Sequence, residues 1–283
     1  MQPAQGALMG LLKRIIFREP IKHPRLQRIW SRLHTIAIFG MNYSGGGLIE
    51  SSGEIWVLSE ILAKACKHLP APVVFDVGAN VGDYSLCLRG IVPTARIFAF
   101  EPSQSVYQQL ARRITEAHAD DQIKAYNFGF SDSERTVELY SYTVEGNEAS
   151  VLSSIDQRLP TQVLDVQTGC SEQIQVQTID RWCAAEGIGR IDFLKLDVEG
   201  HELSVLHGAQ RMLTSGSISM IQFEFGPANI YSRTYFYDFW SLLSGTYDIY
   251  RIVPKGLAPM KYYGEHNEIF LTTNYLARKK RAS

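Results

Sequence analysis

Residues 75–85, FDVGANVGDYS, decide the fold of this chain. The segment overlaps the end of a short apolar run at residues 73–77, which is typical of a buried parallel strand. Its glycines let the backbone turn tightly and approach a ligand, and the helix expected from Gly82 offers unpaired amides at its N-terminus. Because open parallel sheets bind ligands at the carboxyl ends of their strands, the segment predicts an α/β domain with a ligand site at this loop.

The charges in this loop distinguish two classes of ligand. The dinucleotide fingerprint G-x-G-x-x-G, counted from Gly78, would need glycines where the chain has Asn80 and Asp83. Asp76, at the end of the expected strand, would face a pyrophosphate of like charge. S-adenosylmethionine instead carries a sulfonium and an ammonium against one carboxylate, so an acidic side chain favours its binding. The loop therefore favours S-adenosylmethionine over a dinucleotide.

A second acidic residue supports this interpretation. Glu101 ends the next expected strand, in FAFEPS at residues 98–103, where a carboxylate can accept hydrogen bonds from both hydroxyls of a ribose. Many nucleoside cofactors present a ribose, so Glu101 indicates this cofactor only in combination with Asp76 and Asn80. The alternative is that both carboxylates are solvated groups at strand ends.

Short apolar runs alternate with helical patterns along most of the chain. The expected strands are residues 73–77, 96–100, 122–127, 191–196 and 219–223, and the expected helices are residues 54–68, 82–90, 103–117, 202–213 and 235–243. Further strands are expected at residues 135–142 and 173–177, around a polar insertion, and at 247–253 and 268–272 as a closing antiparallel pair. Buried strands between helices predict a mainly parallel sheet covered on both faces.

The order and spacing of these motifs resemble the FkbM family of S-adenosylmethionine-dependent methyltransferases. The resemblance covers residues 40–277 and rests on FDVGANVGDYS, FAFEPS, NFGFSD at residues 127–132, IDFLKLDVEGHELSVLHGA at 191–209, FEFGPANIYSRTYF at 223–236 and EIFLTTNYLA at 268–277. It implies the class I methyltransferase fold, a Rossmann-like α/β architecture. The seven-stranded sheet of that fold has the order 3-2-1-4-5-7-6, with the last strand antiparallel.

The resemblance also assigns binding roles and an activity. In the first two loops, cofactor-binding roles fall on Asp76, Gly78, Asn80, Gly82 and Glu101. The turn after the third strand is implied to border the adenine, with Asn127, Ser131 and Asp132 as its polar residues. Family members are associated with O-methylation of sugars, polysaccharide precursors and polyketide-type natural products. The implied activity is methyl transfer to a hydroxyl of a saccharide, glycan precursor or secondary metabolite.

The segment at residues 192–202, DFLKLDVEGHE, brings several ionisable groups to the edge of the expected sheet. Strand periodicity places Lys195 and Asp197 on one face, and we expect Asp197 to stand nearest the methyl donor and to be essential. Methyl transfer to oxygen needs the reacting atoms in line and a late removal of the hydroxyl proton. The candidates for accepting that proton are Asp197, Glu199, His201 and, from the end of the fifth strand, Glu224. The sequence leaves the choice among them open.

These residues also have plainer interpretations. His201 has the most suitable unperturbed pKa, about 6.5, but could be an exposed residue at a helix start. Glu199 and Glu202 would be favourably placed charges in the first turn of a helix, and Lys195 could simply pair with an acid. The acids at this edge could also hold Mg²⁺, but their spacing does not demand a metal.

Contacts to the acceptor are expected from the N-terminal segment and from two loops. One loop spans residues 42–53, and the later one carries Asn229, Tyr231, Tyr235 and Tyr237. Aromatic rings stack on sugar faces while amides and acids bind hydroxyls, so this composition suits a polyhydroxylated acceptor. The same tyrosines could be ordinary core or rim residues.

Charge is distributed unevenly along the chain. Residues 1–49 hold seven Lys/Arg and one Glu, a balance of +6, the tail at 278–281 adds +4, and the other residues balance to −11 within the total of −1. The acidic body argues against nucleic acid as a partner. Two amphipathic helical patterns near residues 8–16 and 26–37 form either a cap on the main domain or a surface for a membrane or protein partner. A catalytically inactive binding module that uses this basic cap is the alternative function.

Three regions are expected along the chain. They are a basic helical cap with a mobile Gly/Ser-rich loop at residues 1–53, the cofactor-binding domain at 54–277 and a basic tail at 278–283. Four separated cysteines without a C-x-x-C pair predict reduced, mostly buried thiols rather than zinc ligands. The sequence has no signal-peptide pattern and no apolar run of the about 18 residues that a membrane span needs, so we expect a cytoplasmic protein. The oligomeric state is not predicted.

Overall fold

The computed structural model describes residues 23–45, 49–144, 147–155 and 166–280. The chain divides into two compact units, one up to Tyr43 and one from Ser44. In the first unit, the 3-10 turn Pro24–Leu26 leads into helix α2, Gln27–Gly40, which confirms the second of the two predicted N-terminal helices. The first predicted helix lies outside the described residues. None of the described helices combines the length and the apolar character that crossing a bilayer requires.

The second unit is built on an eight-stranded sheet with the order β11-β10-β12-β9-β8-β1-β2-β3. Five strands are parallel, namely β1 Val73–Val77, β2 Arg96–Phe100, β3 Ile123–Tyr126, β8 Phe193–Leu196 and β9 Met220–Phe225. The C-terminal strands are β10 Tyr247–Val253, β11 Gly256–Met260 and β12 Thr273–Lys279, and β12 runs antiparallel to both β9 and β10. Without β11, this is the predicted order 3-2-1-4-5-7-6, so the prediction was one strand short.

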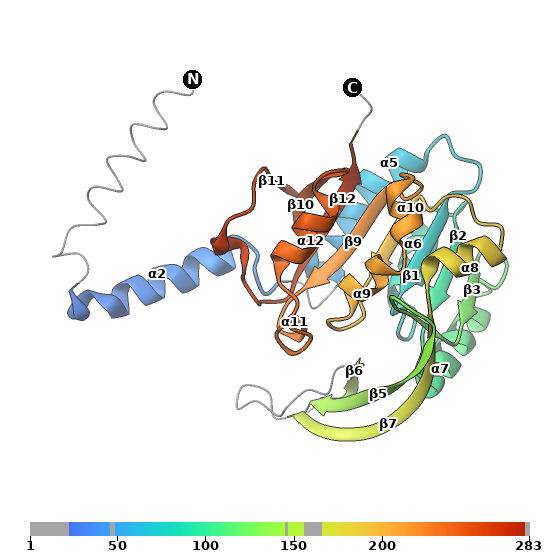
Figure 1. Ribbon diagram of the computed structural model, residues 1–283, viewed down its shortest axis with the longest axis horizontal. Coiled ribbons are helices and arrows are strands. Elements are labelled where there is room, and N and C mark those ends of the chain that lie inside the picture. The colour runs from blue at the N-terminus through green and yellow to red at the C-terminus, as the bar shows by residue number, and fades with distance from the viewer. Residues whose placement is uncertain (1–22, 46–48, 145–146, 156–165, 281–283) are drawn as a thin grey trace. The chain divides into compact units, whose positions relative to one another are not determined.

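Helices cover both faces of this sheet (Figure 1). One face packs against α4 Glu54–Trp56, the π-helical turn Val57–Leu62, α5 Ala63–Cys66, α6 Asp83–Ile91 and α7 Gln104–Glu116. The other packs against α8 Ile179–Ala185, α9 Glu202–His207, α10 Gln210–Thr214 and α12 Phe236–Leu243. Successive side chains of a strand point to opposite faces of the sheet. Val74 therefore packs in the core on the α6 and α7 side, and Phe75 packs in the core on the α8 and α9 side.

An aromatic cluster fills the core beneath β1 and β2. The ring of Trp182 from α8 lies 5.3 Å from Phe75 and 5.0 Å from Phe100, edge to face in both pairs. Phe100 lies 4.6 Å from Phe130, again edge to face. This packing holds the carboxyl ends of β1 and β2 rigidly, and the candidate site is at these ends.

A second sheet has the order β4-β7-β5-β6, and its long strands β5 and β7 form a curved ribbon (Figure 1). Its strands are β4 Gly129–Phe130, β5 Arg135–Val144, β6 Asn147–Ser154 and β7 Val166–Gln177. The predictions at 135–142 and 173–177 found the right strands but made both too short. The polar insertion between them contributes β6 and the first half of β7, because long antiparallel pairing supplies hydrogen bonds that need little apolar patterning.

The predicted C-terminal strand at residues 268–272 is wrong. These residues form no strand, and β12 begins at Thr273. Glu268 instead accepts hydrogen bonds from the amides of Phe236 and Tyr237 at 2.8 and 2.9 Å, so its carboxylate caps the start of α12. Because β12 continues to Lys279, the first two residues of the predicted basic tail lie in the sheet.

Two further predictions need correction. The predicted helix at 202–213 is broken between α9 and α10, where a Cβ on Gly208 would lie 2.0 Å from the carbonyl oxygen of Ser131. The end of the Gly/Ser-rich loop is not irregular, because residues Ile49–Ser52 form the short helix α3. Cys66 and Cys183 are buried, Cys87 is half-buried, and all three are free thiols, whereas the side chain of Cys170 lies outside the described residues.

Candidate active site

The loop after β1 touches the loop after β8 through its backbone. Gly78 has a φ of 79°, and a Cβ at this position would lie 1.8 Å from the carbonyl oxygen of Asp197. The amides of Gly78 and Ala79 both donate to the carbonyl oxygen of Phe100 at 3.0 Å. Gly82, with a φ of 90°, is the N-cap residue of α6. Only glycine fits at position 78, and the two loops form one backbone cradle at the carboxyl edge of the sheet.

Glu101 follows β2 beside this cradle and is buried. Its Oε2 accepts a hydrogen bond from the amide of Asn80 at 3.0 Å, and its Oε1 accepts one from the amide of Ser103 at 2.9 Å. Burial raises the pKa of Glu101 to about 7, against the opposing effect of these amides. Asn127 donates from Nδ2 to the carbonyl oxygens of Glu101 and Pro102, so it fixes the turn that carries the carboxylate.

Asp76 belongs to a row of buried polar side chains that crosses three central strands. Its neighbour in register on β8 is Lys195, whose own neighbour on β9 is Gln222. The ammonium of Lys195 lies 3.6 Å from Asp76 Oδ1, and the hydroxyl of Ser85 donates to Asp76 Oδ2 at 2.6 Å. Asp76 is fully buried, so its charge is compensated within the chain rather than lining an open acidic wall.

Lys195 and Asp197 lie on one face, as strand periodicity predicted, and their side chains pair at 3.0 Å. Burial opposes the charge on Lys195, but the carboxylates of Asp197, Asp76 and Glu54 outweigh it and raise the pKa of the ammonium. The side chain of Asp197 is 39% exposed, whereas that of Lys195 is 6% exposed. Lys195 therefore holds an accessible carboxylate in place at the end of β8.

Glu224 lies two residues after Gln222 on β9, on the same face of the sheet. Burial raises the pKa of Glu224 well above its usual range, and the neighbouring charges of Asp197 and Glu199 raise it further. Glu199 itself has a left-handed backbone with a φ of 55°. The structure thus brings three of the four candidate proton acceptors into one electrostatic group. Within the described parts of the chain, no set of three or more His, Cys, Asp or Glu side chains is arranged to hold a metal ion.

His201, the fourth candidate, is the N-cap residue of α9 but is buried, so its interpretation as an exposed helix-start residue is wrong. Its Nε2 lies 2.9 Å from the hydroxyl of Ser131, which is itself fully buried. Asp132 pairs with Arg135, whose hydrogen bonds hold the pKa of that carboxyl at about 2. His201 and Ser131 therefore join the loop after β8 to the turn after β3.

Glu202 acts within the loop that carries Glu199. Its Oε1 accepts hydrogen bonds from the amides of Val198 at 3.0 Å and Gly200 at 3.2 Å. The side chain is buried, and burial raises the pKa of Glu202 to about 7. Glu202 thus shapes the loop around Glu199, rather than serving only as a charge in the first turn of the helix.

Glu54 is a buried residue of this site that sequence analysis did not identify. Gln222 donates from Nε2 to Glu54 Oε1 at 2.6 Å, and Ser52 donates to Oε2 at 2.9 Å. The hydroxyl of Tyr84 lies 3.3 Å from Oε1 of Gln222, and the ammonium of Lys195 lies 4.7 Å from the centre of the Tyr84 ring. No spacing pattern marks Glu54, because its partner Gln222 lies 168 residues away in sequence.

The residues predicted to contact the acceptor fall into two classes. Tyr235 and Tyr237 are 55% and 52% exposed, and the ring of Tyr237 packs edge to face on Tyr263 at 5.0 Å. Tyr231 is half-buried in α11, Ala228–Tyr231. Asn229 is buried, and its Oδ1 accepts from the amide of Gly226 at 2.8 Å, so this side chain shapes its own loop.

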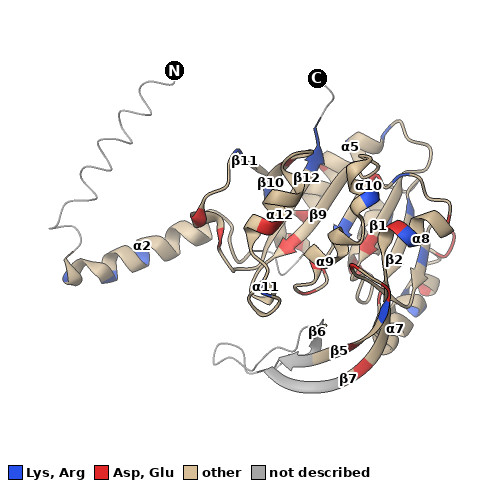
Figure 2. Cartoon of the chain, in the orientation of Figure 1, with Lys and Arg blue, Asp and Glu red and all other residues tan. Residues whose placement is uncertain are grey.

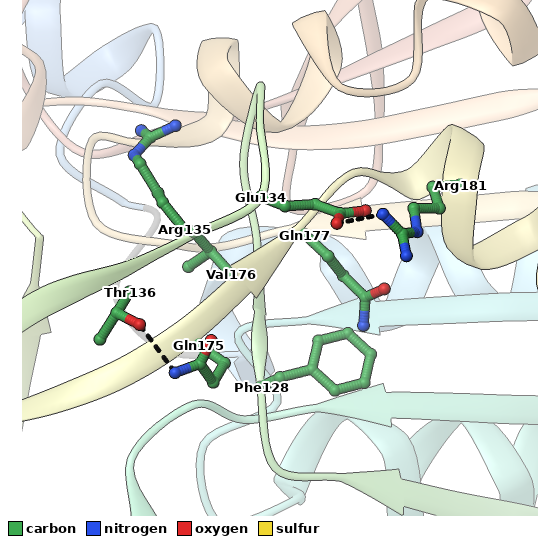
Figure 3. A pocket seen from close by; sticks show the side chains of 8 residues that line it. All are labelled: Phe128, Glu134, Arg135, Thr136, Gln175, Val176, Gln177 and Arg181. Carbon is green, nitrogen blue, oxygen red and sulfur yellow. Dashed lines mark hydrogen bonds and ion pairs between the residues drawn. The ribbon is translucent and has the colours of Figure 1, made fainter.

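A surface cavity of about 360 Å³ lies beside the second sheet rather than at the cradle. Figure 3 shows its lining, in which Arg181 from α8 pairs with Glu134 and Gln175 donates to Thr136 at 2.8 Å. None of its lining residues is a predicted cofactor or catalytic residue. It is linked to the predicted site through Arg135, which pairs with Asp132. The candidate site is therefore defined by the cradle and the side chains around it, not by this cavity.

Comparison with known proteins supports the same region. The model of the methyltransferase FkbM domain matches residues 76–249, which is more than half of the chain. Methyltransferase sdnD of Sordaria araneosa is 31% identical over 175 residues, which cover 54% of this chain and 68% of that protein.

Two more distant relatives have names that include the chemistry or the substrate. The 2-O-methyltransferase NoeI of Sinorhizobium fredii is 26% identical over 150 residues, covering 51% of this chain and 60% of that protein. The hexuronic acid methyltransferase AglP of Haloferax volcanii is 25% identical over 215 residues, which cover 70% of this chain and 81% of that protein. The matched segment contains the cradle, Glu101, Lys195, Asp197 and Glu224. The protein is therefore a methyltransferase and belongs to the FkbM family.

Proposed function

We propose that this protein transfers a methyl group from S-adenosylmethionine to a hydroxyl of a saccharide, a glycan precursor or a secondary metabolite. The observation that carries the proposal is the cradle in which Gly78 meets the carbonyl of Asp197, with Glu101 beside it. In the cradle, the glycine loop that we propose to bind the cofactor and an accessible carboxylate lie at the same edge of the sheet.

The residues at this edge fit the cofactor. Gly78 allows the close backbone contact with Asp197 that any Cβ would block, and Gly82 is the N-cap of a nine-residue helix whose first amides suit a carboxylate. Each carboxylate oxygen of Glu101 accepts a hydrogen bond from one backbone amide and keeps a lone pair for a ribose hydroxyl. The residues that would face the cofactor are Gly78, Asn80, Gly82, Glu101, Asp132 and Asp197. Asp76 and Ser131 are fully buried and Asn127 donates to backbone carbonyls, so these three would hold the surrounding loops in place. When bound, S-adenosylmethionine would supply a methyl group on a positively charged sulfur.

The chain's own side chains would then orient the acceptor and remove its proton. Asp197 is held by Lys195 yet remains 39% exposed, so it can accept a hydrogen bond from the acceptor hydroxyl. Glu224 shares one electrostatic group with Asp197 and Glu199, and in its ionised form its raised pKa makes it a stronger base than an ordinary glutamate. We assign Asp197 to orientation and Glu224 to proton removal, with Glu199 completing the acidic group.

The acceptor class rests on the relatives and on the exposed rings. NoeI is named as a 2-O-methyltransferase and AglP as a hexuronic acid methyltransferase, which makes a saccharide hydroxyl the first acceptor to test. The exposed rings of Tyr235 and Tyr237 are suited to stacking on sugar faces.

The proposal is tested by incubating the protein with isotopically labelled S-adenosylmethionine and extracts of glycans, lipid-linked sugars and small metabolites. Mass spectrometry should find label attached to oxygen in one of these pools. Cofactor binding without transfer to any pool would favour the inactive binding module instead. Tight binding of a nicotinamide dinucleotide in its place would refute the assignment.

Asp197→Asn should fold normally and lose turnover by at least about a hundredfold, because an amide keeps the size of the side chain but weakens its charge-assisted hydrogen bonds. Turnover of labelled methyl donor is the measurement, with the exposed Asp121→Asn as the matched control. Wild-type turnover in Asp197→Asn would remove Asp197 from the mechanism.

A further inference from the structure

Helix α2 exposes an apolar stripe to solvent. Ile29, Leu33 and Ile36 are 53%, 47% and 67% exposed, and α2 contains no buried residue. Their spacing of four and three residues places them on one side of the helix. An exposed apolar stripe of this kind marks a surface that binds a partner.

Basic residues border this stripe, and no acidic residue is near it in sequence. Residues 20–49 contain Lys22, Arg25, Arg28 and Arg32 and no Asp or Glu, a balance of +4. Within α2, Ile29, Arg32 and Ile36 follow one another at intervals of three and four residues, so an arginine lies between two isoleucines along one edge of the helix. Figure 2 shows basic residues and no acidic residue on α2.

We infer that α2 binds in the plane of a membrane surface rich in anionic lipid, with its apolar stripe among the acyl chains and its arginines at the phosphates. A basic helix with one apolar face is the form that interfacial helices take. With 14 residues, α2 is about 21 Å long, too short to span a hydrocarbon core of about 30 Å but long enough to lie on it.

The arrangement of charges favours a lipid surface over other partners. A second copy of the chain that paired α2 with α2 would bring two segments of +4 together, and like charges at close range oppose association. A bilayer presents phosphates directly above acyl chains, which matches an edge on which an arginine lies between two isoleucines. An acidic protein surface would match the positive charge of α2 but would not offer the adjoining apolar layer that a bilayer provides.

The inference is tested by sedimenting the full-length protein with vesicles of phosphatidylcholine alone or mixed with phosphatidylglycerol. We expect binding to the mixed vesicles, little binding to phosphatidylcholine, and weaker binding at high salt because exposed charges are screened. Arg28→Gln with Arg32→Gln should weaken binding by about 25-fold, which is about fivefold for each charge at about 1 kcal/mol per basic residue. Leu33→Gln with Ile36→Gln should weaken it by at least tenfold.

Matched controls separate α2 from general effects of charge and apolar exposure. Arg112→Gln changes an exposed arginine of α7, and Tyr262→Gln changes a side chain that is 69% exposed, so both should bind vesicles like the wild type. Unchanged thermal melting would show that the variants fold.

Three outcomes would overturn the inference. One is the absence of binding to anionic vesicles at low salt, which would leave an acidic protein as the partner. Another is binding that the α2 variants leave unchanged. The third is a dimer in solution that Leu33→Gln with Ile36→Gln dissociates while vesicle binding is absent.

Discussion

Glu101 is a carboxyl group that the fold buries and at the same time surrounds with amide donors. Its pKa of about 7 means that its charge changes in the range where the enzyme is expected to work. A ribose hydroxyl donates a hydrogen bond to an ionised carboxylate. Protonation of the carboxylate removes one of the oxygen sites that could accept this hydrogen bond. The proposed cofactor site should therefore be sensitive to pH through this one residue.

The affinity for S-adenosylmethionine should rise about tenfold from pH 6 to pH 8, as Glu101 ionises through its pKa of about 7. Calorimetric titration at pH 6, 7 and 8 measures this. Glu101→Gln should bind more weakly and lose the pH dependence, whereas the exposed Glu116→Gln should keep it. A pH dependence that survives in Glu101→Gln would exclude this residue as its source.

Glu202 should affect stability rather than binding. Its pKa is raised from the usual 4.5 to about 7, so its contribution to stability is present below pH 4.5 and is lost as the pH rises through about 7. Glutamine stays neutral, and its side-chain oxygen can still accept from Val198 and Gly200. The difference in unfolding free energy between Glu202→Gln and the wild type should change by about 2 to 3 kcal/mol in favour of the variant between pH 5 and pH 8. Urea denaturation at both pH values measures the gain, and an equal difference at both would contradict it.

At the scale of elements, the polar row across β1, β8 and β9 is the unusual feature of the sheet. Central parallel strands are usually apolar throughout, and burying a charge is costly unless it is paired. Here Asp76, Lys195 and Gln222 are neighbours in register, so each strand supplies a partner for the next. The row connects the loop after β1 with the loop after β8, and it reaches Glu54 through Gln222.

The contact between these two loops predicts a difference between two glycines. Gly187→Ala should cost about 1 kcal/mol in unfolding free energy, because Gly187 has a φ of 67° but open space around it. Gly78→Ala should cost more than about 3 kcal/mol and abolish cofactor binding, because its Cβ would also overlap the carbonyl of Asp197. Urea denaturation and calorimetry check the pair. Equal losses in the two variants would mean that the loops can separate without cost.

At the scale of the whole molecule, the chain contains two compact units with different compositions. The unit from Ser44 carries the sheet, both cores and the candidate site, whereas α2 in the other unit contributes no buried residue. Stability and membrane binding are therefore expected to reside in different parts of the chain.

Removing residues 1–40 should leave the urea midpoint and the affinity for S-adenosylmethionine within error of the full chain, because the residues named in both cores and in the candidate site all belong to the unit from Ser44. The truncated protein should lose binding to anionic vesicles. Denaturation, calorimetry and sedimentation measure the three properties. A lower midpoint would show that the first 40 residues stabilise the second unit.

Prediction from sequence succeeded where local chemistry is sufficient. Strands β1, β2 and β10 begin and end at the predicted residues, because short runs of apolar or alternating residues bounded by turn residues have few other solutions. Prediction failed at the last strand, because Phe270 packs on Phe225 from a loop and Glu268 in the same loop caps a distant helix. The break between α9 and α10 was missed, and there the chain packs at Gly208 against the carbonyl oxygen of Ser131, a contact between residues far apart in sequence.

The amino-acid sequence by itself determined the fold class and the glycine positions of the first loop, since both depend on short-range periodicity and on backbone angles that few residues adopt. Only the tertiary structure decided which charged groups face one another. It paired Asp76 with Lys195, turned His201 toward Ser131 and brought Glu54 to Gln222. The physical reason is that electrostatic and hydrogen-bond energies depend on distances between atoms, and the spacing of residues along the chain does not specify those distances.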